Sequence, residues 1–401
     1  MRVTAIETIR TDAHDNLIWV RIETDEGYVG LGETFFAPGT VEAHIHGYVA
    51  PRLLGGDATR IEQWHRALMR HPVGYAASGA EVRAASAIDI ALWDLMGRAT
   101  GLPLWRLLGG LVRDDIRVYN TCAGPHYATK SLGEVKRWFG IDHDAVEALD
   151  DLKAFMTDPV RLARELLDEG ITGMKIWPFD FAAFNNGGTG ITAEQVEEGA
   201  RPFRLVREAC GDAMDLMVEL HGLWDLESAK RIIAAVEPYR PAWIEDPIHM
   251  HDAEGLAELS RFTRIPIYGS ETTATKEAFR RLLEQRAVSI VSFDVGWSGG
   301  ITEARKIAAL ADAWQVPVAP HDCTGPVGYV AGACIALTSS NALIQETVRA
   351  YTRGWYAAIA TALPPIENGR LKPLPGPGLG FDLSPHFLAD AGTRRRRSTL
   401  A

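Results

Sequence analysis

The residues best suited to chemistry are acids and histidines that recur, one at a time, at the ends of short apolar runs. In chain order they are Glu219, Glu245, Glu271, Asp294, His321 and Glu346. Successive members lie 23 to 27 residues apart, a spacing typical of one strand followed by one helix. The spacing predicts that these side chains gather at the carboxyl ends of neighbouring parallel strands, the edge where a barrel carries its active site.

Three carboxylates of this series predict a metal site. Glu219, Glu245 and Glu271 stand on three successive strand ends, so their oxygens should converge at one point. Hard oxygen ligands on rigid strand ends, with positions left for water and for substrate oxygens, suit Mg²⁺. We therefore expect one Mg²⁺ ion per chain.

His321 is the candidate general base. Asp294, on the preceding strand, is placed to bond the second ring nitrogen, which would fix the tautomer and raise the basicity of the ring. Lys175 ends an apolar strand on the other side of the barrel mouth, and it is either a second base or a cation that holds the carboxylate of a substrate. Glu346 either hydrogen-bonds that carboxylate or orients a neighbouring group.

His221 is the candidate general acid. In an extended strand, residues i and i+2 point the same way, so Glu219 and His221 should face one site together. A second pair, His249 and His251, lies just past the strand of Glu245. We expect this pair to contact solvent or substrate from a loop rather than to bind a second metal ion.

The elements that must position these residues divide the chain into two parts. Residues 1–115 begin with alternating strands and continue with a buried helix at 84–96, a sequence of elements that predicts an α+β domain. From 116 to 354 strands alternate with helices, which predicts an α/β fold of the TIM-barrel type.

The remaining segments have less specific patterns. Segment 355–390, which contains a Gly- and Pro-rich stretch, should cross back to the first domain, and residues 391–401, with four consecutive arginines, should form a flexible tail. The acidic stretch 142–158 resembles an insertion to which we assign no function. Residues 178–192 should form a loop at the active edge of the barrel.

Composition excludes several classes of protein. A formal net charge of −11 argues against a nucleic-acid or anionic-membrane partner. The chain has no long apolar run and begins directly with a strand-like segment, so we expect neither a membrane span nor a secretory signal, and a cytoplasmic location. The four cysteines show no close pairing, which fits reduced thiols rather than disulfides or a zinc site.

Several motifs together resemble the mandelate racemase-like branch of the enolase superfamily. They are AIDIALWDLMG at 87–97, WIEDP at 243–247, GSE at 269–271, Asp294 before GGITE at 299–303, APH at 319–321 and KPLPGPGLG at 372–380. The resemblance covers residues 1 to about 383. It implies a capping domain over a modified (β/α)7β barrel, and abstraction of the proton next to a carboxylate while Mg²⁺ stabilises the enediolate.

Two features favour elimination over racemisation. Racemases of this branch carry a second lysine two residues after the first on the second barrel strand, whereas here Lys175 is followed by Trp177. The pattern Glu219-Leu220-His221 is similar to that of galactonate-type sugar-acid dehydratases, in which the histidine helps hydroxide leave. Those relatives usually have aspartate as the first metal ligand, so glutamate here is a departure from the pattern.

We therefore predict a Mg²⁺-dependent dehydratase of a sugar acid, an aldonate or aldarate, that yields a 2-keto-3-deoxy acid. His321 would remove the α-proton and His221 would protonate the leaving 3-hydroxyl. One alternative is an epimerase, racemase or cycloisomerase that uses the same enediolate, with Lys175 and His321 on opposite faces. Another is a non-catalytic regulator that binds a sugar acid on the same scaffold.

The substrate is a small carboxylate that the sequence does not identify further. The resemblance places the loops 11–16 and 71–75 over the barrel mouth. The residues expected to contact the substrate are His71, Tyr75, His126, Trp177 and Trp297. Relatives are often dimers or octamers, so we expect a homo-oligomer.

Overall fold

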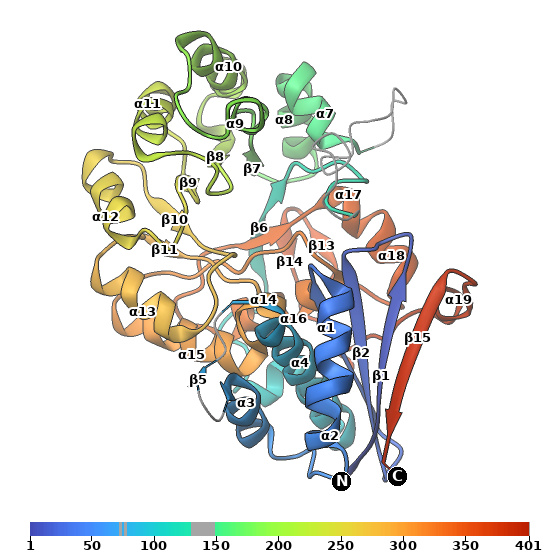
Figure 1. Cartoon of the computed structure of the whole chain (residues 1–401). Coiled ribbons are helices and arrows are strands. Elements are labelled where there is room, and N and C mark those ends of the chain that lie inside the picture. Colours follow the sequence, from blue (N-terminus) through green and yellow to red (C-terminus); the bar gives the residue numbers. More distant parts are fainter. Residues whose placement is uncertain (72–73, 76–77, 130–148, 401) are drawn as a thin grey trace.

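A computed structural model describes residues 1–71, 74–75, 78–129 and 149–400, which form a capping domain and a barrel (Figure 1). The capping domain contains an antiparallel sheet in the order β15–β1–β2–β3. Its strands are β1 (Val3–Thr11), β2 (Leu17–Thr24), β3 (Val29–Phe35) and β15 (Thr393–Thr399). Its other elements are α1 (Pro38–His44), α2 (Ala50–Leu53), α3 (Ile61–Met69), the hairpin β4 (Arg70–His71) and β5 (Gly74–Tyr75), α4 (Ala80–Thr100) and α5 (Leu104–Leu107).

Helix α4 packs closely against strand β3 because two glycines leave room for it. A Cβ atom on Gly32 would lie 1.9 Å from the carbonyl oxygen of Ala87, and one on Gly30 would lie 2.0 Å from that of Ala91. Glycine at both positions therefore allows the backbone of the strand to touch the backbone of the helix.

Residues 391–401 do not form the flexible tail that the sequence suggested. Most of them form β15, which pairs antiparallel with β1 and places the C-terminus beside the N-terminal strand (Figure 1). Arg397 donates to both oxygens of Glu23, and Arg394 forms an ion pair with Asp12. The prediction was wrong because the edge of β1 supplies backbone hydrogen bonds and nearby acids offset the charge of the arginines.

The second domain is a closed ring of parallel strands. The strands are β6 (Ile116–Thr121), β7 (Gly173–Ile176), β8 (Asp215–Glu219), β9 (Trp243–Glu245), β10 (Ile267–Gly269), β11 (Ile290–Val291) and β12 (Gln345–Thr347). A bridge at Val318 continues the ring after β11, and β12 closes it by pairing with β6. The predicted α/β architecture, a capping domain joined to a modified TIM-type barrel, is confirmed.

Helices surround the barrel on its outer side (Figure 1). They include α8 (Pro159–Asp168), α10 (Ala193–Cys210), α11 (Leu226–Val236), α12 (Ala253–Phe262), α13 (Lys276–Glu284), α15 (Gly300–Ala313) and α16 (Pro326–Thr338). The inside is filled by a buried cluster that contains Tyr119, Met217, Trp243 and Tyr268, so the strand ends rest on a packed core. Across the described residues, no helix combines the length and apolar character that crossing a membrane requires.

The C-terminal segment contacts both domains. It contains α17 (Arg349–Thr352), α18 (Trp355–Ile359), β13 (Ile366–Glu367), β14 (Arg370–Leu371) and α19 (Pro385–Ala389). Strand β14 pairs with β6 of the barrel, whereas the N–H of Leu379 donates to Asp94 on α4 (2.7 Å).

Glu33 on β3 links the capping domain directly to the barrel, because it accepts a hydrogen bond from the N–H of Gly328 at the start of α16 (3.0 Å). Burial raises the pKa of Glu33 to about 8.

The stretch that resembled an acidic insertion is partly a helix. Its first part, 142–148, lies outside the described residues, but α7 (Asp151–Thr157) follows, with Asp150 as its N-cap. The carboxylate of Asp151 is buried and bonds two nitrogens of Arg349, which follows β12 (2.6 and 2.7 Å). The acid at Asp151 therefore anchors this helix to the barrel.

Candidate active site

The three glutamates predicted as metal ligands converge at the carboxyl ends of the barrel strands. Glu219 ends β8, Glu245 ends β9 and Glu271 lies two residues after β10. One carboxylate oxygen of each lies within 4.8 Å of the other two, and all three residues are buried. Each also has a buried oxygen that accepts no hydrogen bond from the described part of the chain. These converging oxygens fit a small, hard dication such as Mg²⁺.

Burial makes this acidic triad, Glu219, Glu245 and Glu271, electrostatically unfavourable on its own. Burial and the charge of Glu219 raise the pKa of Glu245 well above its usual value. Burial acts in the same direction on Glu219, but the charges of His221 and Lys175 outweigh it and lower the pKa. A dication bound by the triad would favour the ionised form of all three carboxylates.

Lys175 lies among these carboxylates rather than across the mouth from them. Its ammonium nitrogen is 2.9 Å from an oxygen of Glu245, 2.9 Å from Glu346 and 3.3 Å from Glu219. Burial alone would lower the pKa of Lys175, but the charges of Glu245, Glu346 and Glu219 raise it well above its usual value. The geometry is that of a fixed cation beside the triad.

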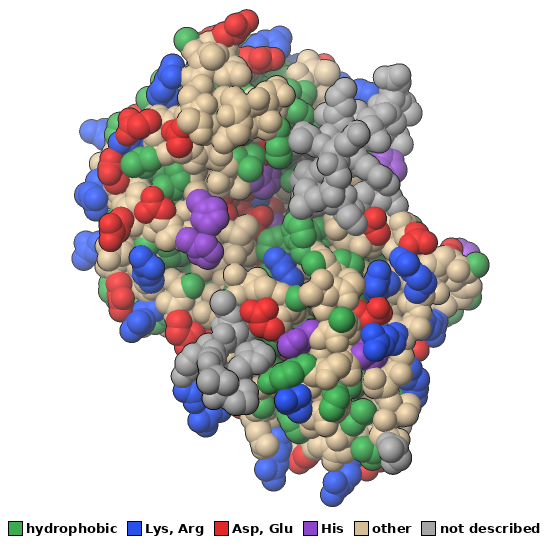
Figure 2. All heavy atoms as spheres, viewed as in Figure 1, with side chains coloured by type: hydrophobic (Ala, Val, Ile, Leu, Met, Phe, Trp, Pro, Cys, Tyr) green, Lys and Arg blue, Asp and Glu red, His purple; other side chains and the backbone are tan. Residues whose placement is uncertain are grey.

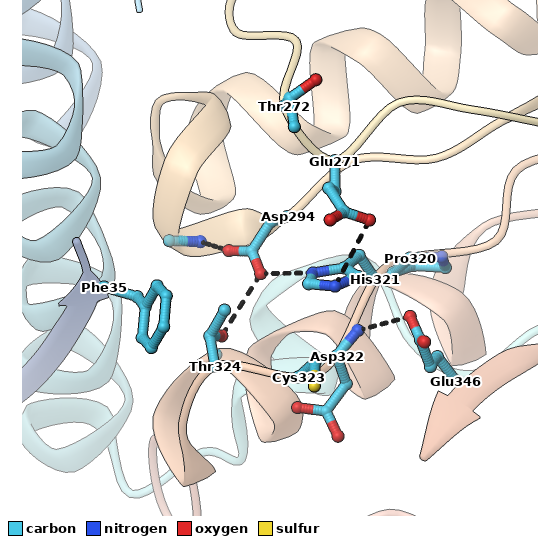
Figure 3. Close-up of polar contacts among 12 residues, drawn as sticks. Phe35, Glu271, Thr272, Asp294, Pro320, His321, Asp322, Cys323, Thr324 and Glu346 are labelled. Atoms are coloured by element: carbon cyan, nitrogen blue, oxygen red, sulfur yellow. Dashed lines mark hydrogen bonds and ion pairs between the residues drawn. The ribbon is translucent and has the colours of Figure 1, made fainter. Parts of the chain in front are cut away.

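Glu346, for which the sequence left two roles open, contacts groups on three neighbouring segments. One carboxylate oxygen bonds Lys175 and the hydroxyl of Thr121, and the other accepts the N–H of Asp322 (2.9 Å). The last contact fixes the backbone next to His321 (Figure 3). Glu346 thus connects the lysine to the loop that carries the candidate base.

His321 and Asp294 lie together as predicted (Figure 3). Nδ1 of His321 is 2.9 Å from an oxygen of Asp294, which also accepts the hydroxyl of Thr324 (3.2 Å). The other oxygen of Asp294 accepts the N–H of Gly296 (2.7 Å), so the carboxylate cannot rotate freely. Nε2 of His321 faces Glu271 at 3.4 Å. Burial would lower the pKa of His321, but with no cation in the triad Glu271 and other nearby carboxylates outweigh burial and raise it to about 10. A dication held by Glu271 would offset that negative charge and lower the pKa again, which would leave Nε2 able to accept a proton.

His221 reaches the site in a different way from the one predicted. Strand β8 ends at Glu219, and His221 has a left-handed backbone with φ 48°, so the alternation of an extended strand does not apply. Its N–H donates to Glu219 (2.6 Å), Nδ1 is 2.6 Å from buried Asp180, and Nε2 is 3.2 Å from the hydroxyl of Tyr127. Against burial, the charges of Glu219 and Asp180 raise the pKa of His221 to about 9.

Two residues beside His221, Asp180 and Tyr127, were not among those predicted from the sequence. Asp180 is the first residue of α9 (Asp180–Asn186), inside the stretch predicted as a loop. The available signal was an acid only three residues after Trp177, at the end of a barrel strand. Tyr127 lies after β6 in a segment without a recognisable pattern.

Two of the five residues predicted to contact the substrate, Trp177 and Trp297, lie beside the candidate catalytic histidines. The ring of Trp177 lies 5.7 Å from that of His221, and the ring of Trp297 lies 5.5 Å from that of His321. His126 is exposed on the segment after β6. The side chains of the other two, His71 and Tyr75, lie outside the described part of the structure.

The histidine pair after β9 is not part of a recognisable second metal site. His249 and His251 are exposed, with ring centroids 4.9 Å apart. Among the described residues, the acidic triad is the one group of three or more ligand-type side chains placed to hold a metal ion.

Figure 2 shows acidic and histidine side chains inside a hollow between the barrel and the capping domain, with hydrophobic and basic side chains along its edge.

Comparison with known families matches both domains. Residues 2–109 match the mandelate racemase/muconate lactonizing enzyme N-terminal domain, and residues 158–387 match the enolase C-terminal domain-like family. The chain belongs to the enolase superfamily, in the mandelate racemase/muconate lactonizing enzyme family.

Solved structures agree with this assignment. An enolase of the mandelate racemase subgroup from Agrobacterium tumefaciens is 42% identical, covers 100% of this chain and 99% of its own, and has a TM-score of 0.87. An enolase from the Sargasso Sea environmental genome is 41% identical, with the same coverage and a TM-score of 0.88. A protein from Salmonella enterica serovar Typhimurium, provisionally named a dehydratase, is 28% identical, with 95% and 96% coverage and a TM-score of 0.83.

Proposed function

We propose that the protein is a Mg²⁺-dependent dehydratase of sugar acids, either aldonates or aldarates. The observation that carries this proposal is a pair of histidines at the two ends of the acidic triad. His321 lies beside Glu271 and His221 beside Glu219, and each ring is bonded through Nδ1 to a buried aspartate. Elimination needs one group that removes a proton from carbon and another that protonates the leaving hydroxyl, and two histidines can divide these tasks.

In this mechanism Nε2 of His321 removes the α-proton, because Nδ1 is bonded to Asp294 and Nε2 faces the triad. Nε2 of His221, next to the hydroxyl of Tyr127, protonates the departing 3-hydroxyl. The electron pair of the C–H bond first passes onto the substrate carboxylate as an enediolate, and it then forms the C2=C3 bond as the C3–O bond breaks. Water leaves, and the enol product tautomerises to a 2-keto-3-deoxy acid.

The acidic triad and Lys175 serve the carboxylate end of the substrate. Mg²⁺ held by Glu219, Glu245 and Glu271 would supply positive charge where negative charge develops on the carboxylate as the α-proton leaves. The ammonium of Lys175 adds a second positive charge at the same place. A small carboxylate is thus the expected partner, and we further propose a cytoplasmic homo-oligomer.

The other two functions have less support. Epimerisation or cycloisomerisation through the same enediolate would need Lys175 as a base on the opposite face, but its ammonium is held within 3.3 Å of three carboxylates. A non-catalytic regulator would not need two oriented histidines. The provisional dehydratase name of the similar structure from Salmonella enterica also favours elimination.

The test compares two variants, each with Mg²⁺ and sugar acids in D₂O. His321→Asn should lose both deuterium incorporation at C2 and formation of the keto product, because the base is missing. His221→Asn should still incorporate deuterium at C2 but should lose the keto product, because only the leaving step is affected. His386→Asn, at an exposed position on α19, serves as the control. Full dehydration by His321→Asn would contradict the assignment of the base.

A further inference from the structure

Arg83 places a cation with free hydrogen-bond donors where the capping domain meets the barrel. It lies in the first turn of α4, and one nitrogen donates to the carbonyl of Phe35 (2.8 Å). Within the described residues, its guanidinium makes no other hydrogen bond, and no carboxylate forms an ion pair with it. Most of the donors of this group are therefore available to a ligand.

Aromatic rings hold this guanidinium in place. Its central carbon lies 4.6 Å from the ring centroid of Trp297 and 5.3 Å from that of Phe36. Phe36 and Ala37 both have left-handed backbones, with φ values of 75° and 47°, which are unfavourable for residues with a side chain. Such strain concentrates at functional sites, and here it occurs in the loop that supplies one of the two rings.

Arg83 is within reach of the reacting centre. Both Arg83 and His321 lie against Trp297: the guanidinium carbon is 4.6 Å and the ring centroid of His321 is 5.5 Å from the Trp297 ring, so the guanidinium lies no more than about 10 Å from the candidate base. Two acids act on its charge, Asp294 and Glu81. Both oxygens of Asp294 are already bonded within the barrel, and Glu81 accepts the N–H of its neighbour Gly79.

The charge of Arg83 persists under ordinary conditions. Burial lowers its pKa to about 10, which still leaves the guanidinium protonated near neutral pH. A protonated guanidinium on an aromatic surface, with a free edge, is suited to bidentate recognition of a carboxylate or phosphate.

We propose that Arg83 binds a second anionic group of the substrate, at the end remote from the reacting carboxylate. This inference rests on the proposed function and specifies it: the enzyme would prefer sugar diacids, or acids with a terminal phosphate, over monoacids. In a six-carbon aldarate, four bonds of about 1.5 Å separate C2 from the second carboxyl carbon. With the C–O bond of the carboxylate and a hydrogen bond of about 2.8 Å, an extended substrate reaches roughly 8–9 Å beyond C2, which is comparable to the separation of at most about 10 Å between His321 and Arg83.

The test measures kcat and KM for an aldarate, the aldonate of the same configuration, and that aldonate 6-phosphate. Arg83→Gln should lower kcat/KM about 10- to 100-fold, mainly through KM, for whichever substrate carries the second anionic group. It should change the aldonate less than threefold. Whether the diacid or the phosphate is the better substrate of the natural enzyme identifies the anion. Equal losses for all three substrates, or no loss for any, would overturn the inference.

Two further variants separate a local effect from a folding defect. Arg83→Lys keeps the positive charge but not the planar guanidinium with its paired N–H donors, so it should recover part of the kcat/KM that Arg83→Gln loses. Arg305→Gln is the matched control, because Arg305 is an exposed arginine that lies over another tryptophan, Trp93 (5.5 Å). It should leave all three substrates unchanged.

A binding measurement keeps this inference distinct from the proposed function. Adipate and hexanoate have six carbons and no hydroxyl to eliminate, so calorimetry with Mg²⁺ reports binding alone. Arg83→Gln should weaken adipate about 10-fold or more and leave hexanoate unchanged. If no sugar acid is dehydrated but adipate binding depends on Arg83, the proposed function fails and the anion site stands. If dehydration occurs and neither readout depends on Arg83, the anion site fails alone.

Discussion

Asp180→Asn tests whether the second histidine takes part in the leaving step. Asp180 is buried and its carboxylate lies 2.6 Å from Nδ1 of His221. The bond fixes the ring so that Nε2 is the nitrogen free to act, beside Tyr127. An asparagine has nearly the same shape but no charge, so the substitution weakens this bond without opening a cavity.

The expected size follows from the kind of bond that is lost. A hydrogen bond to a charged group contributes about 1.5–3 kcal/mol. If that free energy orients His221 in the transition state of the leaving step, kcat for dehydration should fall about 10- to 150-fold. KM should change little, because Asp180 contacts His221 rather than the substrate.

The assay follows keto-acid formation and deuterium incorporation at C2 in parallel. Asp180→Asn should lower the rate of keto-acid formation about 10- to 150-fold. The rate of deuterium incorporation should stay within about threefold of that of the natural enzyme, because removal of the α-proton depends on His321. Asp212→Asn is the control, because Asp212 is an exposed aspartate that also forms ion pairs. If Asp180→Asn lowers exchange and elimination equally, or neither, then Asp180 does not act through His221 in the leaving step.

Three further predictions concern the metal and the stability of the fold. Added Mg²⁺ should raise the thermal midpoint, EDTA should reverse the rise, and Glu245→Gln should abolish it, as measured by scanning fluorimetry. Deletion of residues 391–401 should lower the midpoint by roughly 5 °C or more, because the edge of β1 loses its partner; an unchanged midpoint would argue against this pairing. Contacts with His65 and Lys276 outweigh burial and lower the pKa of Glu303 to about 2. Because this pKa lies below the unfolded value, Glu303 stabilises the fold by about 3 kcal/mol above pH 4.5, a contribution lost as the pH falls toward 2. In urea unfolding, Glu303→Gln should lower the free energy of unfolding by about 3 kcal/mol at pH 7 and by less at pH 3. Equal decreases at the two pH values would contradict this role of Glu303.

The acidic triad could be predicted because its rule is simple. Parallel barrel strands bring their carboxyl ends to one edge, so residues one strand–helix unit apart must meet there. The same rule gave the pairing of Asp294 with His321. For Lys175 the rule gave the correct edge, but only the structure shows that its ammonium lies between Glu245 and Glu346.

Residues outside this rule could not be found in the same way. His221 lies past the end of its strand, where a left-handed backbone and not strand alternation directs the ring. Asp180 starts a short helix, and Arg83 comes from the other domain, more than 200 residues before His321 in the chain. Their proximity to the site depends on how loops and domains pack, which local sequence patterns do not encode. The prediction of a flexible tail at 391–401 failed for a related reason. An acidic partner of the β15 arginines, Glu23, lies on β2, far away in the chain.

The most direct measurement is a turnover screen of sugar acids in D₂O with and without Mg²⁺, with 2-keto products detected as semicarbazones. A sugar-acid dehydratase should convert at least one aldonate or aldarate to a keto product, and only when Mg²⁺ is present. Deuterium at C2 without any keto product would contradict dehydration and indicate an epimerase. Conversion at an undiminished rate after complete removal of the metal would contradict the role given to Glu219, Glu245 and Glu271.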